Sequence, residues 1–113
     1  MPHLVLEYNE YLINDDALPG ILTELHNSAL ASGEFSAGAI KVRALPVRQA
    51  LVGGEPAPFA HLTLAILPGR NDATKDALSE RLLETLHSVL PPVAAASVEI
   101  AELNHYRKWT AAD

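Results

Sequence analysis

The fold of this chain is decided by its first eight residues, Met1-Pro2-His3-Leu4-Val5-Leu6-Glu7-Tyr8. Residues 2–8 form an almost unbroken apolar run, which predicts a β-strand. Such a continuous run is typical of a strand covered on both faces, as in parallel sheets. The strand begins at the second residue, so the terminus of the chain is expected at its tip.

Pro2 is a candidate catalytic base. Methionine aminopeptidase removes Met1 when the next side chain is small enough, and proline qualifies. The product carries a secondary amine, which has no amide resonance and can accept a proton. An α-amino group titrates at about 7.7–8.0, and burial lowers this pKa because it disfavours the charged form. A base poised near neutral pH is what proton transfer needs. Alternatively, Pro2 only begins a strand, where its missing N–H is harmless.

The second half of the chain repeats the first. Residues 2–6 read Pro-His-Leu-Val-Leu and residues 60–64 read Ala-His-Leu-Thr-Leu, a shift of 58 (60 − 2). Residues 22–27, Leu-Thr-Glu-Leu-His-Asn, match residues 83–88, Leu-Glu-Thr-Leu-His-Ser, a shift of 61 (83 − 22). Two matches in the same order indicate a duplication. Only the first copy can offer a terminal amine, because its counterpart, Ala60, lies within the chain.

This duplication predicts the fold. Each half reads as strand, helix, strand, at about residues 2–45 and 59–103, and a tail follows at 104–113. The two βαβ units are expected to form one two-layer α+β domain over residues 1–113, with a mixed four-stranded sheet and both helices on one face. Too few residues remain to cover the other face, so self-association is expected to cover it.

Local patterns place the individual elements. Residues 47–52, between the two halves, could add a short edge strand. Apolar residues at helical spacing predict two helices, the first ending at Ser32-Gly33 and the second at Pro91-Pro92. The predicted strands are residues 2–8, 38–43, 59–66 and 97–103. The expected helix N-caps are Asp15 or Asp16 and Asn71 or Asp72.

Composition limits the class of protein. The 113 residues suffice for one domain with a small core. The chain has no cysteine, which excludes disulfides, a thiol nucleophile and thiolate metal sites. Its net charge of −6 does not indicate the basic surface that binds nucleic acid. No apolar run approaches the ~18 residues of a membrane span. We therefore expect a cytoplasmic protein with neither nucleic-acid nor membrane partners.

Taken in order along the chain, six segments carry a family resemblance. They are residues 1–7 (Met-Pro-His-Leu-Val-Leu-Glu), 18–20 (Leu-Pro-Gly), 32–35 (Ser-Gly-Glu-Phe), 38–43 (Gly-Ala-Ile-Lys-Val-Arg), 59–64 (Phe-Ala-His-Leu-Thr-Leu) and 69–70 (Gly-Arg). This ordered set resembles the 5-carboxymethyl-2-hydroxymuconate isomerase family of the tautomerase superfamily. The resemblance covers residue 2 to about residue 103. The ordered set is more specific than any one of its motifs.

The resemblance implies a homotrimer of duplicated βαβ units, with sheets packed around a central axis. It implies an isomerase in which Pro2 is the base and arginines hold the substrate's carboxylates. The reaction moves a proton along a 2-hydroxydienoate such as 5-carboxymethyl-2-hydroxymuconate, turning the dienol into an unsaturated ketone. In this family the substrate arises in bacterial breakdown of aromatic compounds, and neither a metal nor an organic cofactor is used.

Three cations are the candidate substrate-binding residues. Arg70 follows a predicted strand, at the carboxyl end where parallel strands usually meet ligands. Lys41 and Arg43 share one face of the second strand, since strand side chains alternate. Arginine binds carboxylates bidentately, and the family has arginine where Lys41 stands, so the exact substrate stays open. Arg43 matches a second family arginine, and Arg48 is a weaker candidate. Alternatively, these are solvated turn and edge-strand charges.

The histidines and the tail carry weaker expectations. His3 and His61 occupy equivalent positions in the repeat, as do His26 and His87, so duplication explains them and no metal site is expected. Residues 106–109, Tyr-Arg-Lys-Trp, could contact a neighbouring subunit, close the mouth of a site or fray. Subunit contact is favoured.

Two other functions stay open at this point. The first is a tautomerase that uses the same amine on another enolised 2-oxo acid. The second is a non-catalytic oligomeric binding module that keeps the fold without the reaction.

Overall fold

The computed structural model of the protein describes residues 1–111. Within these residues, neither helix is long and apolar enough to cross a membrane. Along the chain, the elements are β1 (His3–Asn9), α1 (Leu18–Ala31), the 3-10 turn η1 (Ala37–Ala39), β2 (Lys41–Val47), β3 (Leu51–Val52), β4 (Glu55–Pro56), β5 (Phe59–Ile66), α2 (Asp72–Val89) and β6 (Ala95–Glu102).

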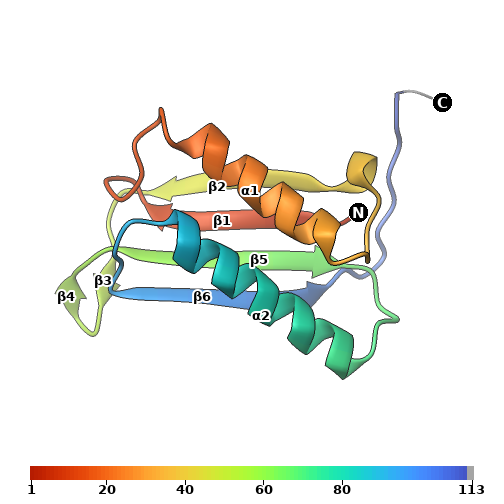
Figure 1. The fold of residues 1–113 in the computed structure, drawn as a ribbon. Coiled ribbons are helices and arrows are strands. Elements are labelled where there is room, and N and C mark those ends of the chain that lie inside the picture. The colour runs from red at the N-terminus through yellow and green to blue at the C-terminus, as the bar shows by residue number, and fades with distance from the viewer. Residues whose placement is uncertain (112–113) are drawn as a thin grey trace.

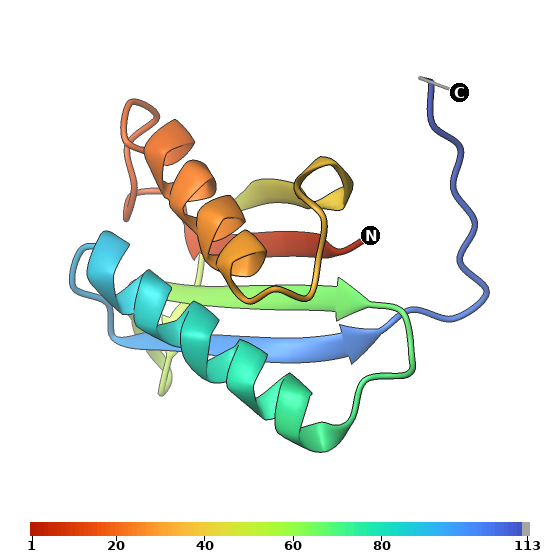
Figure 2. The same cartoon turned by 45° about the vertical axis from the view of Figure 1, so that its right-hand side comes forward.

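Four strands form one mixed sheet in the order β2-β1-β5-β6. The pairs β1–β2 and β5–β6 are parallel, and β1 and β5 run antiparallel at the centre. Both helices lie across the same face of this sheet (Figures 1 and 2). The duplicated two-layer architecture predicted from the repeat is therefore confirmed.

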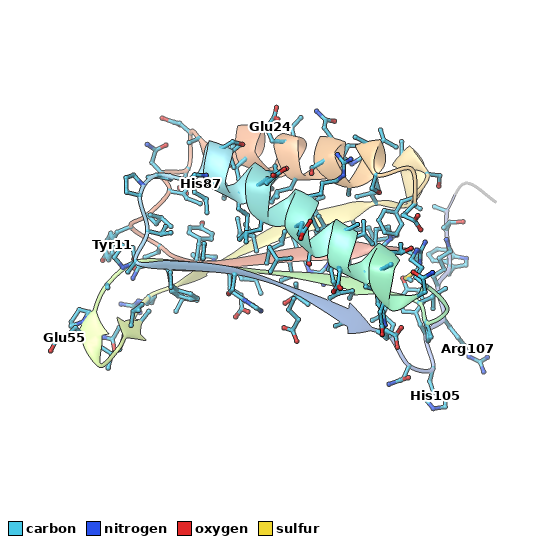
Figure 3. The ribbon with its side chains drawn as sticks, turned by 60° about the horizontal axis from the view of Figure 1, so that its bottom comes forward. Tyr11, Glu24, Glu55, His87, His105 and Arg107 are labelled. Carbon is cyan, nitrogen blue, oxygen red and sulfur yellow. The ribbon has the colours of Figure 1, made fainter. Side chains whose placement is uncertain are left out.

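The core lies between this face and the helices. Strand residues pointing toward the helices are buried, and those pointing away are half-buried, so burial alternates along β1 and β5. In the single chain β1 is thus covered on one face, whereas its continuous apolar run predicts cover on both. No element within residues 1–111 covers the opposite face (Figure 3). The buried apolar residues are Leu4, Leu6, Tyr8, Ile13, Ile21, Leu25, Ala29, Ala60, Leu62, Leu64, Ile66, Leu78, Leu82 and Leu86.

The prediction of one edge strand at 47–52 is wrong. Val47 ends β2, and a separate hairpin pairs Leu51 with Pro56 and Val52 with Glu55. Its two-residue turn is Gly53-Gly54, and both glycines have positive φ, +62° and +85°. Two consecutive positive φ angles are required by the tight turn that suits a twisted hairpin.

Two further boundaries differ from the expectations. The second strand begins at Lys41 rather than at residue 38, because Ala37–Ala39 form η1. The N-cap of α1 is Ala17, without a side-chain cap, so the prediction of Asp15 or Asp16 is wrong.

The predicted N-cap of α2 is confirmed. Asn71 Oδ1 accepts a hydrogen bond from the Thr74 backbone N–H at 2.9 Å. This side chain satisfies one of the N–H groups that a helix start leaves without a backbone partner.

Candidate active site

The candidate residues gather at one end of the sheet. His3, at the start of β1, pairs with Lys41 at the start of β2 and with Ala65 near the end of β5. Arg70 follows β5 at this same end. The terminus of the chain and the beginning of the tail after β6 also lie here (Figure 1).

The terminal amine lies in a partly desolvated, cationic environment. The Pro2 side chain is less than 2 % exposed, and its carbonyl accepts the Lys41 N–H at 3.0 Å. The Met1 amine donates to the carbonyl of Ala39 at 2.9 Å. Burial lowers the pKa of this amine from 8.0 to about 6, helped by Lys41 and then by the charge of Lys108. The Met1 amine is therefore largely neutral at neutral pH.

Lys41 and Arg43 lie on the face of β2 that points away from the helices. The alternate residues of this strand, Val42 and Ala44, pack against the core on the other face, as strand alternation predicts. The Lys41 ammonium donates to the Ala39 carbonyl at 3.0 Å, the same oxygen that holds the Met1 amine. This shared acceptor places the Lys41 charge beside the terminus.

His3 connects Arg43 to the tail. Arg43 Nη1 lies 3.1 Å from His3 Nδ1, and His3 Nε2 lies 2.9 Å from the hydroxyl oxygen of Tyr106. The rings of His3 and Tyr106 meet edge to face, with centroids 5.6 Å apart and planes at 74°. Burial, then the charges of Arg43, Lys41 and the terminal amine, lower the pKa of His3 below 6.5. His3 is therefore neutral at neutral pH.

Arg70 reaches this end of the sheet but is held by another loop. Its Nε donates to Glu34 Oε1 at 2.8 Å, and its Nη2 donates to the Glu34 carbonyl at 3.0 Å. Its guanidinium also lies over the Phe35 ring, 4.8 Å from the centroid. A carboxylate ligand would share Arg70 with Glu34, using the N–H groups that Glu34 leaves available.

Arg48, the weaker candidate, lies at the other end of the sheet. It lines a hollow of about 630 Å³ together with Asn9 and Tyr11. Figure 3 places Tyr11 and Arg107 at opposite ends of the sheet. Because β1 carries the chain from Pro2 to Asn9, about 23 Å at 3.3 Å per residue, Arg48 does not meet Pro2 within one chain.

The second copy of the repeat has no equivalent cationic site. His61 matches His3, and its cross-strand neighbour on β6 is Ser97, where the first copy has Lys41. His61 Nδ1 lies 2.7 Å from Ser97 Oγ, and His61 Nε2 lies 3.0 Å from Glu99 Oε1. Residues 1–111 contain no group of three histidine or carboxylate side chains arranged to hold a metal.

Tyr106 and Lys108 are the two site residues that sequence reasoning did not assign. The tail was notable for its run of aromatic and basic residues, and closing the mouth of a site was one of three alternatives. No periodicity in the tail predicts which strand it meets. In the structure, Tyr106 contacts His3, and the charge of Lys108 acts on the terminal amine.

Comparisons with known proteins identify the family and the fold. A family model described as 5-carboxymethyl-2-hydroxymuconate isomerase matches residues 2–112. A 5-carboxymethyl-2-hydroxymuconate isomerase structure from Deinococcus radiodurans R1 is 28% identical, with a TM-score of 0.75, covering 96% of this chain and 87% of that one. A 5-carboxymethyl-2-hydroxymuconate delta-isomerase structure is 21% identical, with a TM-score of 0.77 and coverages of 97% and 88%.

A fused 4-OT protein described as a symmetric trimer is 17% identical, with a TM-score of 0.77, covering 96% of this chain and 91% of that one. No curated protein sequence matches the chain. The family match extends over nearly every residue, and the structural matches share the duplicated fold. The chain therefore belongs to the 5-carboxymethyl-2-hydroxymuconate isomerase family, within the tautomerase superfamily.

Proposed function

We propose that this protein is a cofactor-independent isomerase acting on a 2-hydroxydienoate of the 5-carboxymethyl-2-hydroxymuconate type, with Pro2 as its general base. The position of the terminal amine carries this proposal. It lies at the tip of a buried strand beside Lys41, where the pKa of the Met1 amine falls to about 6. With Met1 attached, the Pro2 nitrogen is an amide and accepts no proton, so removal of Met1 is part of the proposal.

The reaction then needs one base and fixed positive charge. The Pro2 amine takes the proton of the enol hydroxyl and returns a proton to a carbon of the conjugated chain, so the dienol becomes an unsaturated ketone. Arg43 and Arg70 bind the substrate's carboxylates through their planar guanidinium groups, and Lys41 assists as a point charge. Preorganised cations stabilise the negative charge that develops during the transfer.

The active form is proposed to be a homotrimer. The face of the sheet opposite the helices is uncovered within residues 1–111 (Figure 3). A fused 4-OT protein of the same fold is described as a symmetric trimer. Three copies packed around an axis would cover this face and place Lys41 and Arg43 at or near a subunit boundary.

Two measurements on untagged protein test the base. Intact-mass analysis should show loss of Met1. The rate of ultraviolet absorbance change with a 2-hydroxydienoate should fall about 10²- to 10⁴-fold in Pro2→Ala, the usual contribution of a general base. Pro46→Ala, which changes an exposed proline at the far end of β2, is the matched control. Complete retention of Met1, or an unchanged rate in Pro2→Ala, would overturn the proline mechanism. A wild type with no measurable rate would favour a non-catalytic binding module.

Lys41 is the observation that favours a second substrate class. A lysine binds a carboxylate less specifically than the arginine that the family has there. Another enolised 2-oxo acid is therefore the alternative substrate. Ultraviolet assays of a panel of 2-hydroxydienoates and phenylenolpyruvate separate the two, because the true substrate class should give the higher kcat/KM.

A further inference from the structure

Three side chains from separate parts of the chain form one line of hydrogen bonds beside the terminal amine. Arg43 comes from β2, His3 from β1 and Tyr106 from the tail. Arg43 Nη1 and His3 Nδ1 are 3.1 Å apart, and His3 Nε2 and the Tyr106 hydroxyl are 2.9 Å apart. His3 thus has a partner at each of its two ring nitrogens.

The direction of these hydrogen bonds is fixed by chemistry. A guanidinium can only donate, so Nδ1 of His3 must accept from Arg43. The ring proton of neutral His3 then lies on Nε2, which donates to the hydroxyl oxygen of Tyr106. Tyr106 therefore supplies the acceptor that matches the tautomer which Arg43 requires.

The second copy of the repeat shows what Tyr106 replaces. His61 is held at both nitrogens by Ser97 and Glu99, two residues of its neighbouring strand. In the first copy the corresponding strand positions are Lys41 and Arg43, and both are cations. The strand offers His3 no acceptor there, and the tail provides one instead.

We infer that Tyr106 is a positioning residue that aims the Arg43 guanidinium, through His3, at a carboxylate of the substrate. Two hydrogen bonds and the edge-to-face ring contact hold the His3 ring in one orientation. Arg43 uses one N–H group on His3 and keeps the others for a bidentate contact with a carboxylate. The inference rests on the proposed function for the identity of the ligand.

The path of the tail supports this role. After β6, the Leu103 N–H bonds the Ile66 carbonyl at 2.8 Å, which fastens the start of the tail to the end of β5. His105 then turns the chain with a positive φ of 52°. The tail passes the end of the sheet where the terminus lies (Figure 2), and Tyr106 reaches His3 there.

Binding of trans,trans-muconate to the full chain tests this inference. Muconate is an unsaturated dicarboxylate without an enol hydroxyl, so it binds without turnover, and calorimetry gives its Kd. Tyr106→Phe keeps the ring against His3 and removes the hydroxyl, and its Kd should rise about 3- to 10-fold, the worth of one net hydrogen bond. Tyr11→Phe, at an 85% exposed tyrosine at the other end of the sheet, should leave the Kd unchanged.

The variant His3→Asn separates positioning from direct contact. Asparagine is too short to reach Tyr106, so in His3→Asn the hydroxyl of Tyr106 no longer has a partner. Adding Tyr106→Phe to His3→Asn should then change the Kd by less than about 2-fold, because the effects of coupled residues are not additive. A full 3- to 10-fold change in that background would mean that Tyr106 meets the ligand itself, which overturns the positioning role. An unchanged Kd in Tyr106→Phe alone overturns it as well.

Turnover distinguishes this inference from the proposed reaction. In Tyr106→Phe, KM should rise by the same factor as the Kd, while kcat stays within about 2-fold of the wild type. If the muconate Kd values of the wild type and variants follow this pattern but the wild type converts no 2-hydroxydienoate, the proposed reaction is wrong and the positioning role of Tyr106 is supported. If the wild type turns over substrate and Tyr106→Phe has the same KM, the proposed reaction is supported and the positioning role of Tyr106 is overturned.

Discussion

Lys41 and Arg43 lie two positions apart on β2, yet they meet different groups. Lys41 shares the Ala39 carbonyl with the Met1 amine, so its charge acts on the terminal amine. Arg43 is hydrogen-bonded to His3 and lies two residues further along β2, away from the terminus. A lysine at position 41 therefore keeps a positive charge beside the terminal amine but lacks the planar fork with which an arginine would bind a carboxylate.

Removing the Lys41 charge should raise the pKa of the terminal amine. A nearby positive charge disfavours the protonated amine, so in Lys41→Ala the pKa should move from about 6 toward 8.0. The Pro2 amine of the processed chain should shift in the same direction, and the acid limb of kcat/KM should move to higher pH with it. Lys108→Ala should give a smaller shift in the same sense. A larger shift in Lys108→Ala than in Lys41→Ala would contradict this order.

At the scale of elements, local patterns predicted the second half better than the first. β5 has its predicted bounds, and α2 begins after Asn71 and ends before Pro91-Pro92, because caps and breakers are local features. The β3–β4 hairpin was missed because residues 47–52 were interpreted as one short edge strand, although Gly53-Gly54 is itself a hairpin signal.

In the candidate site, too, local patterns predicted some features, whereas contacts between distant parts of the chain were missed. Strand alternation placed Lys41 and Arg43 on one face, and the repeat showed that only one copy offers an amine. The contact between Tyr106 and His3 could not be predicted, because it joins residues 103 positions apart through an irregular tail. The pairing of Arg70 with Glu34 likewise depends on how two loops meet in space.

Asn71→Ala tests the capping of α2. The variant loses the acceptor for the Thr74 N–H, which should cost about 1 kcal/mol. For a domain of about this size, the melting temperature should fall by roughly 4–8 °C, measured by circular dichroism at fixed protein concentration. Asn104→Ala, in the exposed start of the tail, is the matched control. Equal melting temperatures for the two variants would show that the cap contributes nothing measurable.

At the scale of the whole molecule, the uncovered face of the sheet is polarised. Its two edge strands are β2 and β6. β2 presents Lys41 and Arg43 on this face, whereas β6 presents Glu99 at the position that corresponds to Arg43 in the repeat. In a cyclic trimer the two sides of each interface come from different surfaces of the subunit. A ring of copies would therefore bring the cationic edge of one subunit toward the acidic edge of the next.

Glu99→Lys should weaken this assembly. The Glu99 side chain is 57% exposed in the single chain, so it can meet a partner's cations, and a lysine there would oppose them. Like charges across an interface cost several kcal/mol, so the concentration for half-dissociation should rise about 10-fold or more, measured by sedimentation velocity and light scattering. Glu84→Lys makes the same charge change on the exposed surface of α2 and should leave assembly unchanged. Equal weakening by both variants would point to net charge rather than edge pairing, and a wild type that stays monomeric would remove the trimer altogether.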